Sequence, residues 1–104
     1  MFNTHTAISK FLTARYAEDV DKAQRAAELL LNVGAPQMGM SKPVAERHGR
    51  VDIQRAELQQ RFLDETVLPH LGADGPLGEN ADRQLRLLAW AYSNHPDYKD
   101  RWLP

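Results

Sequence analysis

The aliphatic residues of this chain are strongly biased towards leucine and alanine. Leu and Ala together number 26, whereas Val and Ile together number 7. Leucine and alanine lose little side-chain freedom in a helix, while β-branched residues suit pleated sheets. No run of Val, Ile and Thr shows the alternation expected of a strand. The sequence therefore predicts an all-α fold.

The first predicted helix covers about residues 7–31. Its apolar residues recur at steps of three and four, which places them on one helical stripe. They are Ile8, Phe11, Leu12, Tyr16, Val20, Ala23, Ala27, Leu30 and Leu31. Gly34 and Pro36 are expected to end this helix, because glycine suits a left-handed stop and proline hinders continuation.

The second predicted helix covers about residues 50–68. A short turn over residues 41–46 precedes it, and Gly49 leaves open whether that turn continues into the helix. Pro69 is expected to end the helix, because proline disfavours helical geometry in the residue before it. Three glycines and one proline in the segment 72–78 predict a loop.

The third predicted helix covers about residues 81–93, with Asn80 as its N-cap. Its second half is apolar nearly all round, which predicts a central, buried element. After a break at Pro96, a short C-terminal helix is expected over residues 97–102. Together these elements predict a small bundle of three main helices plus one short helix, folded as a single helical domain over residues 1–104.

The length of the first helix bears on the oligomeric state. A compact chain of 104 residues has a radius of about 13 Å. A helix of about 25 residues extends over roughly 37 Å, which exceeds the diameter of such a globule. A homodimer, in which the protruding end packs on a second chain, explains this length, and so does an elongated monomer.

Composition excludes several classes of protein. The chain has no cysteine, which excludes disulfides, thiolate nucleophiles and cysteine-ligated zinc. Its net charge is −1, which argues against a dedicated nucleic-acid coat. No run approaches the roughly 20 apolar residues of a membrane helix, and the first residues lack the pattern of a secretory signal. We therefore expect a cytoplasmic protein without membrane association.

Groups that carry catalysis or bind metals are not arranged in any known motif. The four histidines are His5, His48, His70 and His95, and no two have the i,i+4 spacing of a helical metal pair. We expect no metal, no cofactor and no enzymatic activity. The alternative is a hydrolase-type site, which would require His48, His70 or His95 to meet a carboxylate in one pocket.

Arginines provide a candidate nucleic-acid-binding surface. Four of them lie in or beside the second and third predicted helices, and guanidinium groups commonly contact phosphates. They are Arg47, Arg50, Arg61 and Arg83. Acidic residues such as Glu46 and Glu57 are interleaved with them, so ion pairs within and between helices are the simpler interpretation. The i,i+4 pairs expected are Asp21–Arg25 and Glu57–Arg61.

Aromatic residues are densest at the C-terminus. Within 13 residues the chain has Trp90, Tyr92, Tyr98 and Trp102. One interpretation is that Trp90 and Trp102 close the core of the bundle. The competing one is that part of the cluster is an exposed binding anchor, because Trp, Tyr and Arg dominate the energetics of interfaces. The candidate protein-binding residues are Arg86, Trp90, Tyr98, Arg101 and Trp102.

The last twenty residues carry a distinctive pattern. A Leu-rich helix from Leu85 is followed by an Ala/Tyr stretch, by His95-Pro96-Asp97-Tyr98 and by a final Trp102-Leu103-Pro104. This ending resembles that of a family of small uncharacterised proteins from actinobacteria and their phages. The chain departs from the family at His48-Gly49, where the family more often has His-Asp-Pro. The resemblance implies a small cytosolic accessory protein and assigns no catalytic or binding residue.

These observations favour a non-enzymatic helical protein that binds another protein, such as a host factor of unknown identity if a phage encodes it. The alternative is a nucleic-acid-associated protein that uses the arginine-bearing helix face.

Overall fold

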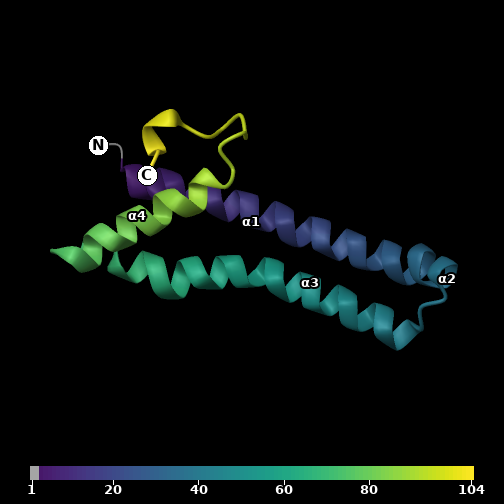
Figure 1. Cartoon of the computed structure of the whole chain (residues 1–104). Helices are drawn as coiled ribbons and strands as arrows, with labels where there is room; N and C mark the ends of the chain where they lie inside the picture. The colour runs from purple at the N-terminus through teal and green to yellow at the C-terminus, as the bar shows by residue number, and fades with distance from the viewer. Residues whose placement is uncertain (1–2) are drawn as a thin grey trace. The chain divides into compact units, whose positions relative to one another are not determined.

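The computed structural model describes residues 3–104, and every regular element in this range is helical. The three main helices are α1 (Thr4–Leu29), α3 (Lys42–Phe62) and α4 (Pro76–Trp90). Shorter elements are α2 (Ala35–Met38), two π-helical turns (Leu30–Gly34 and Leu63–Val67) and two 3₁₀ turns (Leu68–His70 and Asp100–Trp102). The predicted all-α class, with three main helices, is confirmed (Figure 1). None of the described helices has the length and apolar character needed to cross a membrane.

The chain is organised as two compact units. One, here called the terminal unit, comprises the residues up to Arg15 together with Gln60–Pro104, and the other, the hairpin unit, comprises Tyr16–Gln59. Helices α1 and α3 each contribute to both units. The expected single domain over residues 1–104 stays a prediction.

The first helical segment of the hairpin unit continues beyond its predicted end. Gly34 adopts ordinary helical geometry in a π-helical turn, and Pro36 lies in the first turn of α2, where its missing N–H is not needed. The left-handed stop is instead at Gly39, whose φ is 68°. The prediction that Gly34 and Pro36 end the helix is therefore wrong.

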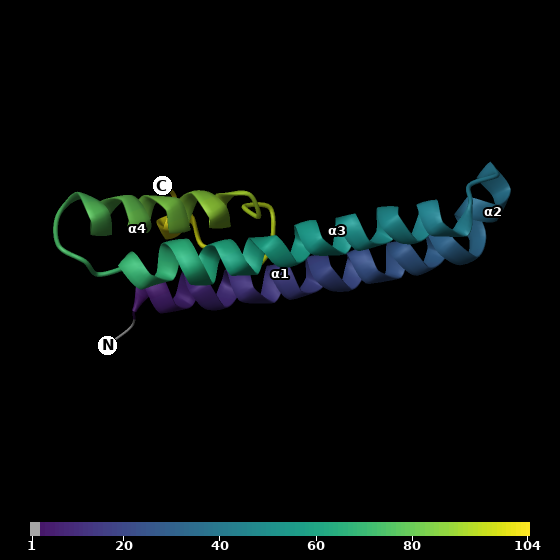
Figure 2. The ribbon, with the colours of Figure 1, turned by 90° about the horizontal axis from the view of Figure 1, so that it is seen from below.

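Two antiparallel helical segments form the body of the hairpin unit (Figures 1 and 2). Helix α3 begins at Lys42 rather than at about residue 50, and Gly49 lies inside it. A Cβ atom at Gly49 would lie 2.7 Å from the Cβ of Ala27 on α1. Gly49 therefore does not interrupt the helix, and its missing side chain lets the two helices approach closely.

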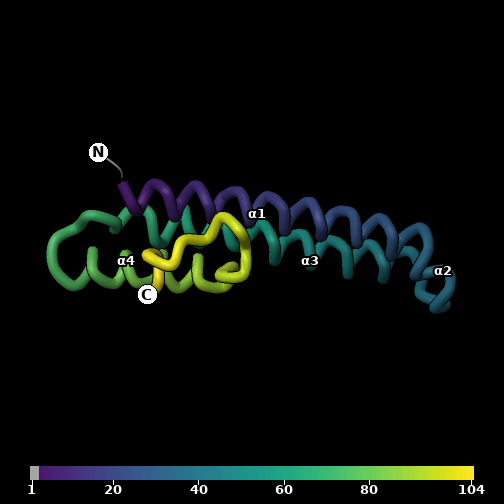
Figure 3. Tube along the Cα trace, turned by 90° about the horizontal axis from the view of Figure 1, so that it is seen from above, coloured from purple at the N-terminus to yellow at the C-terminus, as the bar shows by residue number. Residues whose placement is uncertain are grey.

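The terminal unit contains most of the core. Residues from α1, from the turn after α3 and from α4 are fully buried there. They are Ile8, Leu12, Leu63, Val67 and Leu85. The C-terminal segment folds back along α4 (Figure 3).

Helix α4 differs from its prediction in both bounds and burial. It starts at Pro76 after Gly75, whose φ is 72°, so Asn80 is not the N-cap. It ends at Trp90, and the short terminal element is a 3₁₀ turn over Asp100–Trp102 instead of a helix over residues 97–102. Its second half is not buried all round, because only one face packs on the core while Leu87 and Trp90 are exposed.

Candidate functional site

Two of the candidate aromatic residues belong to the core of the terminal unit. Trp102 is 4% exposed and Tyr98 is 9% exposed. Both rings meet the Phe11 ring edge to face, with centroids 5.2 Å and 6.0 Å away, respectively. Burial, followed by the charge of Asp100, raises the pKa of Tyr98 above its ordinary value. Tyr98 and Trp102 therefore hold the C-terminal segment on α1 and are not accessible to a partner.

A buried arginine ties the same segment to α1. The Arg15 guanidinium lies 5.1 Å from the centre of the Phe11 ring, and its Nη1 lies 2.9 Å from Nδ1 and 2.6 Å from Nε2 of His95. The Asp97 backbone N–H donates to Nδ1 of His95 at 3.0 Å. The Asp97 carboxylate is 3.8 Å from Arg15. Sequence analysis missed this cluster, although the i,i+4 spacing of Phe11 and Arg15 places both on the buried stripe.

The other candidate tryptophan lies on the outside of the terminal unit. Trp90 is 54% exposed and Leu87 is 47% exposed, and both project from the outer side of α4. Arg83 is also exposed and precedes Leu87 by one turn. These three residues are called the α4 face below. The prediction that both tryptophans close the core is wrong for Trp90.

Of the two candidate arginines, Arg86 makes hydrogen bonds within the terminal unit. The Arg86 Nε donates to Asp82 at 3.0 Å, and its Nη1 donates to the backbone carbonyl of Arg101 at 3.2 Å. Arg101 itself is exposed. Of the five candidate protein-binding residues, Trp90 is the one that presents a large apolar surface.

A hydrogen-bond network joins the start of α1 to α4. His5 Nε2 lies 2.7 Å from Asp82, which also accepts from Arg86. Burial alone would raise the pKa of Asp82, but the hydrogen bonds from His5 and Arg86 outweigh it and lower the pKa below its ordinary value. The network borders a hollow of about 630 Å³. A carboxylate held in its ionised form is suited to binding cations rather than to donating protons at neutral pH.

Histidines are not gathered into a site. His95 contacts Arg15 and lies near Asp97, whereas His48 is exposed on α3 of the hairpin unit. Across residues 3–104, no hydrogen bond or ion pair joins His48, His70 and His95 to one another, and no three His, Asp or Glu residues are placed to hold a metal ion. The hydrolase-type alternative stays a hypothesis.

The candidate nucleic-acid-binding arginines lie among carboxylates. Arg61 pairs with Glu65 at 3.1 Å instead of with Glu57, whereas the predicted Asp21–Arg25 pair forms at 2.5 Å. Arg47 and Arg50 are exposed on α3, and Arg83 is exposed on α4. Ion pairing of this kind is the simpler interpretation for Arg61, and the nucleic-acid alternative stays a prediction.

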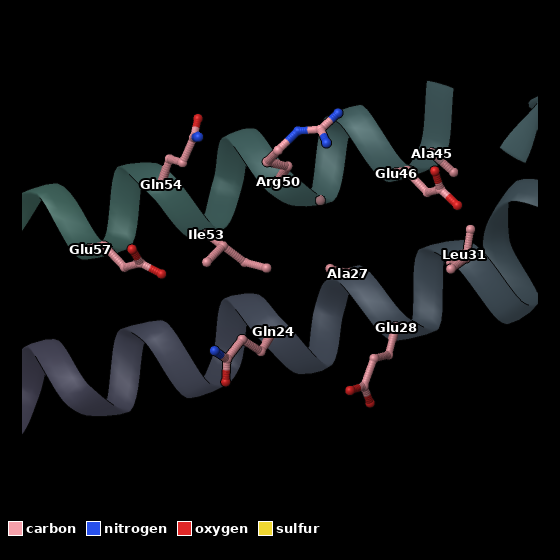
Figure 4. A pocket seen from close by; sticks show the side chains of 11 residues that line it. Gln24, Ala27, Glu28, Leu31, Ala45, Glu46, Arg50, Ile53, Gln54 and Glu57 are labelled. Carbon is pink, nitrogen blue, oxygen red and sulfur yellow. The ribbon is translucent and has the colours of Figure 1, made fainter. Parts of the chain in front are cut away.

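An open groove runs along the hairpin unit between α1 and α3 (Figure 4). Its volume is about 680 Å³, and its floor consists of small and aliphatic residues. These are Ala27, Leu31, Ala45, Gly49 and Ile53. In Figure 4, Ile53 extends from α3 towards α1, while Glu28 and Arg50 extend away from the seam between the helices. Sequence analysis missed this groove because it depends on the close approach at Gly49.

The rim of the groove is polar, and half of its residues are acidic. It consists of Gln24 and Glu28 from α1 and of Glu46, Arg50, Gln54 and Glu57 from α3, all exposed. Three carboxylates and one guanidinium therefore line the groove. Within residues 3–104, Glu28, Glu46 and Glu57 form no ion pair. The groove thus combines an apolar floor with a rim of net negative charge.

Comparison with known proteins gives a match at the level of a family. A family model with the description "Family of unknown function (DUF6221)" matches residues 5–104. This range includes α3, α4, the C-terminal segment and all of α1 except Thr4. No curated protein and no solved structure matches the chain. The description names no activity or ligand, so it assigns no role to the residues above.

Proposed function

The chain belongs to DUF6221, a family of unknown function, and we propose that it is a small non-enzymatic helical protein that acts by binding another protein. The expectation that it belongs to a family of uncharacterised proteins is thereby confirmed. We also propose that it comes from an actinobacterium or an actinobacterial phage, as its C-terminal ending implies. In that setting the protein is a cytoplasmic accessory factor that acts on a host protein.

Exposure of Trp90 is the observation that carries this proposal. A tryptophan that is 54% exposed beside a leucine that is 47% exposed leaves a large apolar area in water. Such residues are the usual energetic centres of protein interfaces, particularly with arginine at the rim. Arg83, one turn before Leu87, supplies that rim. Trp90 is also free to act as an anchor, because Tyr98 and Trp102 already hold the C-terminal segment.

Photo-crosslinking in actinobacterial cells tests the proposal. A benzophenone amino acid replaces Leu87, and a control carries it at Asp64, an exposed position of the same unit. We expect a discrete protein adduct at position 87, no such adduct at position 64, and loss of the adduct in the Trp90→Ala variant. Identical adducts at both positions, or an adduct that survives Trp90→Ala, would contradict a binding role for the α4 face.

A further inference from the structure

The groove of the hairpin unit has the dimensions of a helix-binding site. Along α3 it extends from Ala45 to Glu57, and along α1 and the π-helical turn after it from Gln24 to Leu31. At 1.5 Å per residue, the α3 side is roughly 18 Å long, which equals about three helical turns. An α-helix of about 12 residues therefore matches the length of the groove.

Small residues on the floor allow such a helix to approach closely. Ala27, Ala45 and Gly49 have little or no side chain, and Leu31 and Ile53 are only half-buried. Two antiparallel helices leave an open seam on each side, and a third helix is the element that commonly fills a seam of this kind. The aliphatic floor indicates that the occupying face is itself aliphatic.

The charged residues that line the groove indicate which residues flank the aliphatic face of the bound helix. Glu28 lies on the α1 side of the groove, Glu46 and Glu57 lie on the α3 side, and Arg50 is the one cation of the lining. Carboxylates on both sides favour a helix with Lys or Arg on either side of its apolar stripe.

We propose that this groove binds an amphipathic helix of a partner protein whose apolar stripe is flanked by lysine or arginine. A second copy of the chain fits less well, because two grooves facing each other would each bring three carboxylates and one guanidinium to the contact. Like charges brought together in this way oppose association. The groove and the α4 face lie in different units, so the groove can be tested without reference to Trp90.

Two synthetic helical peptides of about 15 residues provide the test. Both carry a Leu/Ala stripe, flanked by lysine in one peptide and by glutamate in the other. Binding to the full chain is measured by fluorescence anisotropy at low and high salt. We expect the lysine peptide to bind, the glutamate peptide not to bind, and the affinity for the lysine peptide to fall with added salt.

Substitutions locate the binding site. The triple variant Glu28→Gln, Glu46→Gln, Glu57→Gln should weaken binding of the lysine peptide about tenfold, since each exposed ion pair contributes modestly. The matched control is Asp52→Asn, Asp74→Asn, Glu79→Gln, which removes the same charge at exposed positions outside the groove. We expect this control to keep most of the wild-type affinity. Circular dichroism verifies that both variants are helical.

Three results would overturn the proposal. The first is that the lysine peptide does not bind. The second is equal weakening by the two triple variants, which would show attraction to overall charge alone. The third is a dimer, seen by sedimentation equilibrium, that the groove substitutions strengthen, because that dimer would assign the groove to a second copy.

Discussion

A Cβ atom at Gly49 of α3 would lie 2.7 Å from the Cβ of Ala27 on α1, closer than two such carbons can approach. The missing side chain of Gly49 lets the two helices of the hairpin unit approach closely here, and both residues line the groove. Glycine inside a helix normally costs about 1 kcal/mol relative to alanine. The cost is offset here by packing that no larger residue permits.

Gly49→Ala is expected to destabilise the hairpin unit. Overpacking typically lowers the free energy of unfolding by about 1–3 kcal/mol, while the better helix propensity of alanine raises it by about 1 kcal/mol. Adding Ala27→Gly removes the opposing methyl group and leaves the Ala27 Cα atom at 3.4 Å as the nearest neighbour. The double variant should therefore recover part of the lost free energy of unfolding in urea titrations. Simple additivity of the two single substitutions would contradict direct contact at this site.

The two tryptophans should differ sharply in their effect on stability. Trp102→Ala removes a ring that is 4% exposed and packs on Phe11, and it should cost about 3–5 kcal/mol of unfolding free energy. Trp90→Ala removes an exposed ring and should change that free energy by no more than about 0.5 kcal/mol. Thermal unfolding followed by circular dichroism measures both. Comparable losses for the two variants would show that Trp90 is also part of the core.

Because of the Tyr16 phenol, the free energy of unfolding should fall as the solution becomes alkaline. Burial, with a contribution from Asp19, raises the pKa of this phenol to about 12 from an ordinary value of 10.0. Between these values the unfolded chain releases the proton while the folded chain retains it, so rising pH favours unfolding. A shift of this size corresponds to roughly 2–3 kcal/mol across the window.

Comparison with Tyr16→Phe isolates this effect. The difference in unfolding free energy between wild type and variant should decline as the pH rises from about 10 to about 12. Ultraviolet titration should also lose one late tyrosinate step in the variant. A difference that is constant over this range would contradict burial of the Tyr16 phenol.

Asp82 should stabilise the terminal unit in its ionised form. Its hydrogen bonds with His5 and Arg86 outweigh the effect of burial and lower its pKa, so its contribution is complete above its ordinary pKa of about 4. The contribution is lost as the pH falls through the lowered value. Because His5 and Asp82 are about a third exposed, we expect the loss in Asp82→Asn to be below about 1 kcal/mol at neutral pH.

Acid titration distinguishes this network from a simple packing contact. The stability difference between wild type and Asp82→Asn should shrink as the carboxylate becomes protonated, whereas a packing effect would persist at low pH. Glu79→Gln, an exposed carboxylate in the first turn of the same helix, is the control.

The helical class and the approximate positions of the main helices follow from the sequence alone. The Leu/Ala bias and the apolar stripe from Ile8 to Leu31 are local patterns, because each depends only on residue type or on residues close together in the sequence. The Asp21–Arg25 pair is equally local, because residues four apart always meet on a helix. The positions of the helix ends were less predictable, since Gly34, Pro36 and Gly49 are all accommodated within helical segments.

Tertiary structure decided which of these residues are buried, exposed or paired. Trp90 and Trp102 are the same residue type in one short segment, yet only Trp102 meets Phe11, which lies far away in the sequence. The His5–Asp82 hydrogen bond likewise joins residues from opposite ends of the chain. Composition and periodicity determine which segments become helical, because those preferences act between near neighbours. Burial, the groove and the α4 face depend on which distant side chains meet, and that is settled only when the helices pack.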